Sequence, residues 1–404
     1  MDSDQKSRII YNNLSYFGLD LDSIYKKSAA KFSEIIINKF PKKNEIHIIC
    51  GLGGNGLDGL YVAYELFKAD RAVSIYIPDR ISHSDSELFQ NKFQELSKKI
   101  NIKQDVYAKD IPQADLIIEA LIGTGMSGEK VYKRTADIIK RVSHFDCPII
   151  AIDKPMQGYN PDLTISINYP KTQKAVAIEN VYPEALINSI GPGELLEIRK
   201  PYAKSHKTKS GKLLLISFSP DTASERKLVA LSKHYQTEVE VVSIETLFTD
   251  YRKDEYKEKL SGVDVVVIDN FKQADNLIAN VVYSFLDLMG EAKVINLNSE
   301  IHFQENSIEV LASPRHISTS TAFVKLVKSY SSYFLFEDGD KKIDAEGVLV
   351  SDQNVENLIL LASIFATSND LKLSVLAAAF VVIHFRKNKL DMEKDLSKFF
   401  QEIF

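Results

Sequence analysis

The stretch that decides the fold reads Ile46-His-Ile-Ile-Cys50-Gly-Leu-Gly-Gly-Asn55-Gly-Leu-Asp-Gly59. Its apolar beginning predicts a buried strand, its glycines a tight turn, and the residues that follow the start of a helix. Gly51, Gly53 and Gly56 have the spacing G-x-G-x-x-G, which lets the backbone approach a phosphate at a helix N-terminus. We therefore expect a site for a nucleotide-like ligand. A turn without a ligand is the alternative, because this spacing alone is weak evidence.

Apolar strand patterns alternate with helical patterns around this stretch. Two helices are expected within residues 10–40, and further helices at Asp58–Phe67, Ser84–Lys98 and Val131–Val142. Strands are expected at Ile46–Cys50, Ala72–Ile77, Leu116–Glu119, Pro148–Ile152, Leu163–Ile167 and Ala175–Ile178. This alternation predicts an α/β fold, a Rossmann-like three-layer sandwich with a parallel sheet between helices.

A polar, basic connector around Leu195–Gly211 separates this series from a second one, which runs from Leu213 to Arg386. We place the domain boundary between residues 198 and 199. The second series alternates strands and helices in the same way, so we expect residues 199–404 to form a second α/β domain.

The composition excludes several classes of protein. The net charge of −5 over 404 residues gives no electrostatic reason to expect nucleic acid or an anionic membrane as a partner. The longest apolar run, Val375–Ile383, is far shorter than the roughly 20 residues that span a bilayer. The polar N-terminus predicts no signal peptide, and the two cysteines, Cys50 and Cys147, form neither a disulfide framework nor a metal motif. We expect a cytoplasmic protein.

Acidic residues stand at the ends of several expected strands. Asp79 follows Ala72–Ile77, where a Rossmann domain has its ribose-binding acid. Glu119 precedes a second glycine turn, and Asp153 follows the strand Pro148–Ile152. Ligands of open α/β sheets lie beyond the carboxyl ends of strands. One crevice should therefore gather a set of oxygen-bearing side chains, namely Asn55, Asp58, Glu119, Thr124 and Asp153.

Asp58 argues against an ordinary dinucleotide site. A carboxylate in the first helical turn would occupy the positive end that a pyrophosphate needs. Oxygen donors from Asn55 and Asp58 suit a hard cation, or the hydroxyls of a ribose or of a hydrated ring. A helix-capping carboxylate is the alternative for Asp58.

These motifs together resemble those of the NAD(P)H-hydrate epimerases. The family loop G-P-G-N-N-G-G-D-G is matched by Gly51–Gly59 except at Leu52, Gly54 and Leu57. The family's D-A-L-F-G-T-G-L-S corresponds to Glu119–Ser127, and V-D-I-P-S-G to Ile152–Gln157. The resemblance implies an enzyme that interconverts the epimers at C6 of hydrated NAD(P)H, a damaged form of the cofactor.

The resemblance also implies roles for individual residues. Asp153 would face the reacting ring as the catalytic acid or base. Asn55 and Glu119 would hold a potassium ion, at a site weakened because Met156 replaces the family's serine ligand and its thioether suits potassium poorly. The hydrated NAD(P)H would be lined by Gly54, Asn55, Gly56, Leu57, Asp58, Gly123, Thr124, Gly125, Met126 and Ser127.

The second half resembles the ADP- or ATP-dependent NAD(P)H-hydrate dehydratases, which implies a ribokinase-like domain. Ser205-His206-Lys207 and Gly211 look like that family's S-H-K-G…G. Its glycine-rich turn is replaced by Asp269-Asn-Phe-Lys272, and the G-T-G-D motif with the catalytic Asp is not found between Gly347 and Ala366. Without these a nucleotide phosphate lacks both its donors and its base. We predict that this domain is a degenerate one that does not dehydrate, which makes ADP or ATP a doubtful cofactor.

The sequence leaves three functions open. The leading one is an epimerase that repairs nicotinamide nucleotides, with a small-molecule nucleotide as its partner and a homo-oligomer as its expected state. The second is a non-catalytic binding or scaffold protein that uses the same two folds. The third, an ordinary NAD-dependent dehydrogenase, needs an acid or base at a hydride-transfer site, and the sequence shows none.

Overall fold

The computed structural model divides the chain into two compact units, Asp2–Ile187 and Asn188–Phe404. The division lies before the predicted boundary at residues 198 and 199, because α7 (Pro192–Glu197) packs against α13 (Leu371–Lys387) of the second unit. The structure describes residues 1–123, 133–156, 158–198, 211–217, 222–235, 237–250, 261–269, 285, 292–296, 308–311, 324–327, 333–336, 341–343 and 352–403.

The first unit contains a parallel sheet of seven strands in the order β3-β2-β1-β4-β5-β6-β7. The strands are β1 (Glu45–Cys50), β2 (Ala72–Ile77), β3 (Asn101–Gln104), β4 (Leu116–Ala120), β5 (Ile149–Ile152), β6 (Leu163–Ile167) and β7 (Ala175–Ile178). The predicted α/β fold with a parallel sheet is confirmed. Successive strands are added on one side of β1 and then, from β4 on, on the other side. The crevice between β1 and β4 is therefore a topological switch point, the usual position of a ligand in such sheets.

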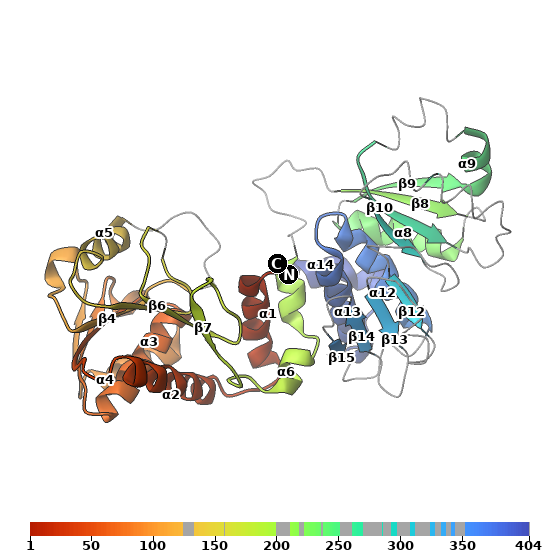
Figure 1. Cartoon of the computed structure of the whole chain (residues 1–404). Helices are drawn as coiled ribbons and strands as arrows, with labels where there is room; N and C mark the ends of the chain where they lie inside the picture. The colour runs from red at the N-terminus through yellow and green to blue at the C-terminus, as the bar shows by residue number, and fades with distance from the viewer. Residues whose placement is uncertain are drawn as a thin grey trace. The chain divides into compact units, whose positions relative to one another are not determined.

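Helices cover both faces of this sheet, and two separate apolar clusters fill the space beneath them. In Figure 1, α5 lies on one side of the strands and α2, α3 and α4 lie on the other. The helices of the unit are α1 (Ser3–Tyr16), α2 (Leu21–Lys39), α3 (Gly54–Lys68), α4 (Glu87–Leu96), α5 (Lys133–Val142) and α6 (Glu184–Asn188), with short 3-10 turns at η1 (Ile81–His83) and η2 (Ala108–Asp110). The predicted three-layer arrangement is confirmed.

Burial explains which strands the sequence pattern reveals. All residues of β4 and β5 are buried, and they are almost all apolar. The edge strand β3 reads Asn-Ile-Lys-Gln and is largely exposed, so it carries no apolar pattern and the sequence did not predict it. The capping of α2 by Asp20 and of α4 by Ser86 fixes where these helices begin.

The described part of the second unit contains two four-stranded sheets and several helices, so the prediction of a second α/β domain is confirmed. The order in its parallel sheet is β11-β10-β8-β9, with bounds β8 (Lys212–Ser217), β9 (Glu238–Ser243), β10 (Val263–Asp269) and β11 (Lys293–Asn296). The other sheet joins β12 (Ile308–Leu311), β13 (Val324–Val327), β14 (Tyr333–Phe336) and β15 (Lys341–Ile343). The helices among its described residues are α7, α8 (Ala223–Tyr235), α9 (Ile244–Asp250), α12 (Asp352–Ala366), α13 and α14 (Met392–Ile403).

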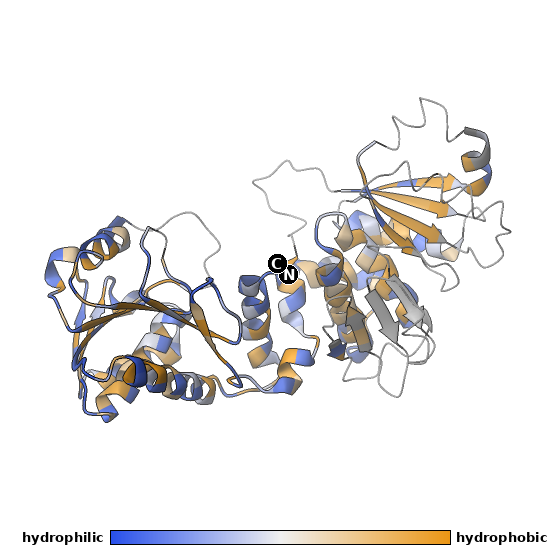
Figure 2. Cartoon of the chain, in the orientation of Figure 1, coloured by the Kyte–Doolittle hydropathy of each residue, from blue (hydrophilic) through white to orange (hydrophobic). Residues whose placement is uncertain are grey.

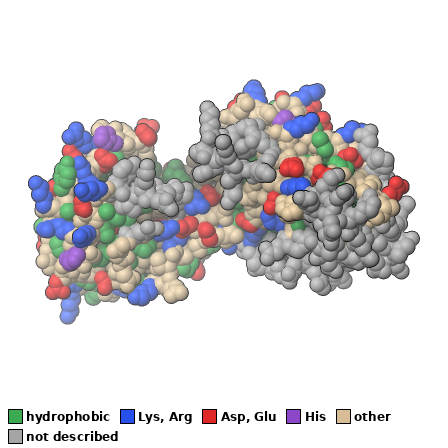
Figure 3. Space-filling model, turned by 90° about the horizontal axis from the view of Figure 1, so that it is seen from above, with side chains coloured by type: hydrophobic (Ala, Val, Ile, Leu, Met, Phe, Trp, Pro, Cys, Tyr) green, Lys and Arg blue, Asp and Glu red, His purple; other side chains and the backbone are tan. Residues whose placement is uncertain are grey.

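The hydropathy colouring in Figure 2 shows β8 and β10 as mostly hydrophobic strands. The residues that resemble dehydratase motifs, Ser205–Lys207 and Asn270–Lys272, lie outside the described residues, as does the predicted strand Gly347–Val350. Within the described part of the chain, no helix is both long enough and apolar enough to cross a bilayer. On the face seen in Figure 3, the coloured acidic and basic side chains of the first unit are interspersed.

Glycines set the distance between α3 and the sheet. A Cβ at Gly59 would lie 2.7 Å from Cys50 Sγ and 2.8 Å from Ala120 Cβ. A Cβ at Gly56 would lie 1.8 Å from the carbonyl oxygen of Gly51. The first turns of α3 therefore rest directly on the ends of β1 and β4, which no larger residue would allow.

We expect Gly59→Ala to lower the free energy of unfolding by about 1–3 kcal/mol, the usual cost of overpacking a close-packed core. Alanine favours a helix over glycine by about 1 kcal/mol, so helix propensity alone would make the variant more stable. A loss of stability would therefore show that the added Cβ is overpacked. Gly53→Ala is the control, because nothing lies within 4 Å of a Cβ at Gly53. Chemical denaturation of both variants checks this, and equal stability of the two would contradict it.

Candidate functional site

A cavity of about 1020 Å³ lies at the carboxyl ends of the strands of the first unit. The turns after β1, β4 and β5 contribute Gly51–Asn55, Leu121–Gly123 and Asp153 to its wall. Residues of α1 and α2, among them Tyr11 and Tyr25, contribute the opposite wall. The cavity thus occupies the switch point that the strand order creates.

The cavity gathers some of the predicted site residues and leaves others out. Those that line it are Gly54, Asn55, Asp58, Gly123 and Asp153. Gly56 and Leu57 do not line it: Gly56 packs against the backbone of Gly51, and Leu57 belongs to the apolar core beneath α3. Glu119 does not line it either. Thr124, Gly125, Met126 and Ser127 lie outside the described residues.

Asp58 and Asp153 form the chemical centre of the cavity. Asp58 is buried and accepts a hydrogen bond from Ser28 Oγ of α2 at 3.2 Å. Burial, together with the charge of Asp153, raises the pKa of the Asp58 carboxyl well above its usual range. Two carboxyl groups that oppose each other's ionisation supply one proton donor and one proton acceptor at the same pH.

The position of Asp58 corrects two expectations. The helix α3 begins at Gly54, so Asp58 lies in its second turn and leaves the first turn without an acidic residue. The argument that its carboxylate blocks the helix N-terminus is therefore wrong. The capping alternative is also wrong, because the N-cap is Gly53 and no side chain caps the helix.

Asp153 is held in a conformation that is costly for a residue other than glycine. Its φ is +63°, in the left-handed region. Its N–H donates to Ile165 O at 2.7 Å, and its own carbonyl oxygen accepts from Ser166 Oγ at 2.7 Å. Both partners belong to β6, so the neighbouring strand imposes the conformation. Strain of this kind accumulates at functional sites.

Asn55 presents an unsatisfied amide. Its side chain is 8% exposed, and neither Oδ1 nor Nδ2 has a hydrogen-bond partner among the described residues. A Cβ at Gly123 would lie 3.0 Å from Asn55 Cβ and 3.8 Å from Asp153 Oδ2, so the three turns meet here. Buried amides are nearly always hydrogen-bonded, so this amide is a candidate partner for a polar group of a ligand. The uncapped N–H groups of α3 next to Asn55 favour an anionic part of that ligand.

Glu119 has hydrogen-bond partners that the sequence did not predict. Its carboxylate is fully buried: Oε1 accepts from Leu121 N at 2.7 Å, and Oε2 accepts from Met156 N at 3.2 Å and from Tyr159 Oη at 2.9 Å. Both oxygens are therefore occupied by donors, which tie the turn after β4 to the turn after β5. The potassium site predicted at Asn55 and Glu119 stays a prediction. The described residues contain no cluster of three or more His, Cys, Asp or Glu that could hold a metal ion.

Two lysines anchor α1 next to Asp153. The buried Lys171 donates to Ser3 O at 2.7 Å and to Ser7 Oγ, and Lys154 pairs with Asp4. The helix thus forms a fixed wall of the cavity, whose lining includes Ser7, Arg8, Tyr11 and Asn12. No sequence signal marked these residues, because α1 carries no motif of its own.

Comparison with known proteins agrees with the predicted resemblance of the first unit. Residues 22–173 match the family model described as YjeF-related protein N-terminus. A bifunctional NAD(P)H-hydrate repair enzyme of Archaeoglobus fulgidus is 26% identical over 234 residues, and one of Methanospirillum hungatei is 32% identical over 181 residues. An NAD(P)H-hydrate epimerase of Limosilactobacillus fermentum is 29% identical over 174 residues.

The extent of these matches differs between the relatives. They cover 53%, 44% and 39% of this chain, respectively. They cover 48% and 38% of the two bifunctional enzymes and 80% of the epimerase. The chain therefore matches less than half the length of each bifunctional relative. The resemblance of the second unit to dehydratases stays a prediction.

We expect the carboxyl group of Glu119 to make the stability of the chain depend on pH. Burial raises its pKa from 4.5 to about 7, so between these values the folded state binds more protons than the unfolded state. Its contribution, about 3 kcal/mol, is present below the unfolded pKa and is lost as the pH rises through about 7.

Denaturation of wild type, Glu119→Gln and the exposed-site control Glu34→Gln at several pH values checks this. Wild type and the control should lose stability across the window more steeply than Glu119→Gln. The same slope in all three proteins would contradict the burial effect.

Proposed function

We propose that the first unit epimerises hydrated NAD(P)H at C6 of the nicotinamide ring, and so takes part in nicotinamide nucleotide repair. The observation that carries this proposal is the pair formed by the buried Asp58 and the partly exposed Asp153, which line the cavity at the switch point of the sheet. Beside them lies Asn55, whose amide has no hydrogen-bond partner among the described residues. Two similarities support it: residues 22–173 match the model of the YjeF-related protein N-terminus, and the chain is 29% identical over 174 residues to a protein named NAD(P)H-hydrate epimerase.

In this proposal Asp58 and Asp153 have different roles in the reaction. The hydrated ring carries a hydroxyl on C6, next to the ring nitrogen. Asp58, whose pKa is raised by burial and by the charge of Asp153, is the proton donor to this hydroxyl, which leaves as water. The lone pair of the ring nitrogen stabilises the planar cation that remains, and the negative charge of Asp153 lies beside it. Water returns to C6 from the other face and gives its proton to a carboxylate, which restores the pair.

The remaining contacts position the ligand. The amide of Asn55 would bind a polar group of the ring or its ribose, and the N-terminus of α3 would face the pyrophosphate. No step of this reaction is routed through potassium. For the second unit we propose that it contributes no dehydratase activity, since its sequence lacks the glycine turn and the catalytic acid of that reaction.

We expect Asp153→Asn and Asp58→Asn each to slow epimer exchange by about 10²-fold or more, the usual contribution of a general acid or base. Exchange between the two epimers of hydrated NADH and of hydrated NADPH is followed by NMR. Asp146→Asn is the matched control, because Asp146 is exposed and does not line the cavity. Wild type that exchanges the epimers only at the spontaneous rate would exclude the enzyme and favour the scaffold function.

A further inference from the structure

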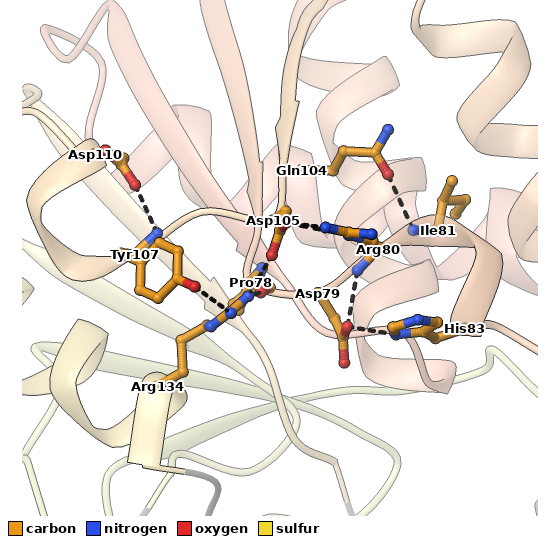
Figure 4. A network of polar contacts seen from close by, with 10 residues as sticks. All are labelled: Pro78, Asp79, Arg80, Ile81, His83, Gln104, Asp105, Tyr107, Asp110 and Arg134. Atoms are coloured by element: carbon orange, nitrogen blue, oxygen red, sulfur yellow. Dashed lines mark hydrogen bonds and ion pairs between the residues drawn. The ribbon is translucent and has the colours of Figure 1, made fainter.

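The cavity has a second end, which the reaction at Asp58 and Asp153 does not use. It lies where β2 and β3 end and where the chain enters α5, and its lining includes Asp79, Arg80, His83, Asp105 and Arg134. Figure 4 shows these side chains as one network of polar contacts. Of these residues, only Asp79 was predicted from the sequence to belong to a binding site.

Arg134 is fixed on three sides. Its Nη1 donates to Pro78 O at 2.5 Å and to Asp105 Oδ1 at 2.6 Å, and its Nη2 donates to Tyr107 Oη at 2.8 Å. Its guanidinium carbon lies 4.1 Å from the centre of the Tyr107 ring. These contacts fix the guanidinium group of Arg134 at a defined place beside the cavity. Its side chain therefore loses little conformational entropy when a ligand binds.

Arg80 is fixed by the other oxygen of the same carboxylate. Its Nε and Nη2 each lie 3.1 Å from Asp105 Oδ2, while its Nη1 has no partner among the described residues. Hydrogen bonds from Arg134 and Arg80 hold the pKa of the Asp105 carboxyl below its usual range. One carboxylate thus sets two guanidinium groups side by side, with a net positive charge for the three groups.

The carboxylate of Asp79 is also occupied by contacts within the protein. Its Oδ1 accepts from the backbone N–H of Arg80 at 2.8 Å and contacts His83 Nδ1 at 2.7 Å (Figure 4). The acid that would bind the ribose hydroxyls of an NAD-type cofactor therefore orients a histidine and an arginine backbone. The groups left to face a ligand are mainly donors.

The distance between the two ends suits a dinucleotide. The strand order β5-β4-β1-β2 places the end of β2 three strand spacings, about 14 Å, from the end of β5 that carries Asp153. The N-terminus of α3 lies between them, at the end of β1. A nicotinamide ring at Asp153 and a pyrophosphate at α3 would bring the adenosine ribose to Arg80.

We propose that Arg80, His83 and Arg134 form a subsite for the 2′-phosphate of an NADPH-type dinucleotide, so that the first unit prefers hydrated NADPH to hydrated NADH. The identity of the dinucleotide rests on the proposed function, whereas the phosphate subsite rests on the network itself. Guanidinium groups bind phosphate through charge-assisted hydrogen bonds, and an arginine after β2 is the usual partner of a 2′-phosphate in nucleotide-binding sheets.

Calorimetric titration of the full chain tests the subsite without the reaction. The probes are adenosine 2′,5′-bisphosphate and adenosine 5′-monophosphate, which both lack the nicotinamide ring and differ in the 2′-phosphate. Wild type should bind the bisphosphate at least about tenfold more tightly, as expected for hydrogen bonds to a charged group. Arg80→Gln and His83→Gln should reduce that ratio, Arg80→Gln the more strongly.

Arg71→Gln is the matched control, because Arg71 precedes the other end of β2, donates to Pro41 O and does not line the cavity. It should keep the wild-type ratio. Equal affinity of wild type for the two probes, binding of neither, or an unchanged ratio in Arg80→Gln would each overturn the proposal. Failure of the proposed function gives a different result, in which the bisphosphate preference is present but no epimer exchange is catalysed.

Discussion

Backbone must touch backbone where β1, β4 and α3 meet, and the rest of the site depends on that constraint. A Cβ at Gly51 would lie 2.0 Å from Leu121 O, and one at Gly56 would lie 1.8 Å from Gly51 O. Glycine at these places lets the turns after β1 and β4 share one crevice, with Asn55 and Gly123 in contact across it. The uncapped end of α3 and the strained Asp153 then face the same cavity.

The unit contains acids whose surroundings give them different roles. Glu119 has both oxygens occupied by protein donors and joins two turns. Asp58 receives one hydrogen bond, from Ser28, and faces the cavity together with Asp153. The carboxylate of Asp105 forms ion pairs with Arg80 and Arg134. Residue type alone does not separate a structural carboxylate from a reactive one; the number and charge of its donors do.

The sequence predicted most of the fold and several of the residues that line the cavity. Strands β2, β6 and β7 have the predicted bounds because apolar residues define them. β3 could not be predicted, because a polar edge strand has no such pattern. Asp58 and Asp153 were predicted because strand ends converge in an open sheet. The roles of Glu119 and Arg134 could not be, since they depend on partners far away in the chain, Tyr159 and Asp105.

The central claim is that Asp58 and Asp153 form one coupled pair. A carboxyl-carbon NMR titration of Asp58, in wild type and in Asp153→Asn, tests it most directly. The account predicts a pKa for Asp58 well above the usual carboxyl range in wild type, because of burial and the charge of Asp153, and a lower one in the variant, where that charge is absent. A pKa for Asp58 in the usual range, the same in both proteins, would contradict the account.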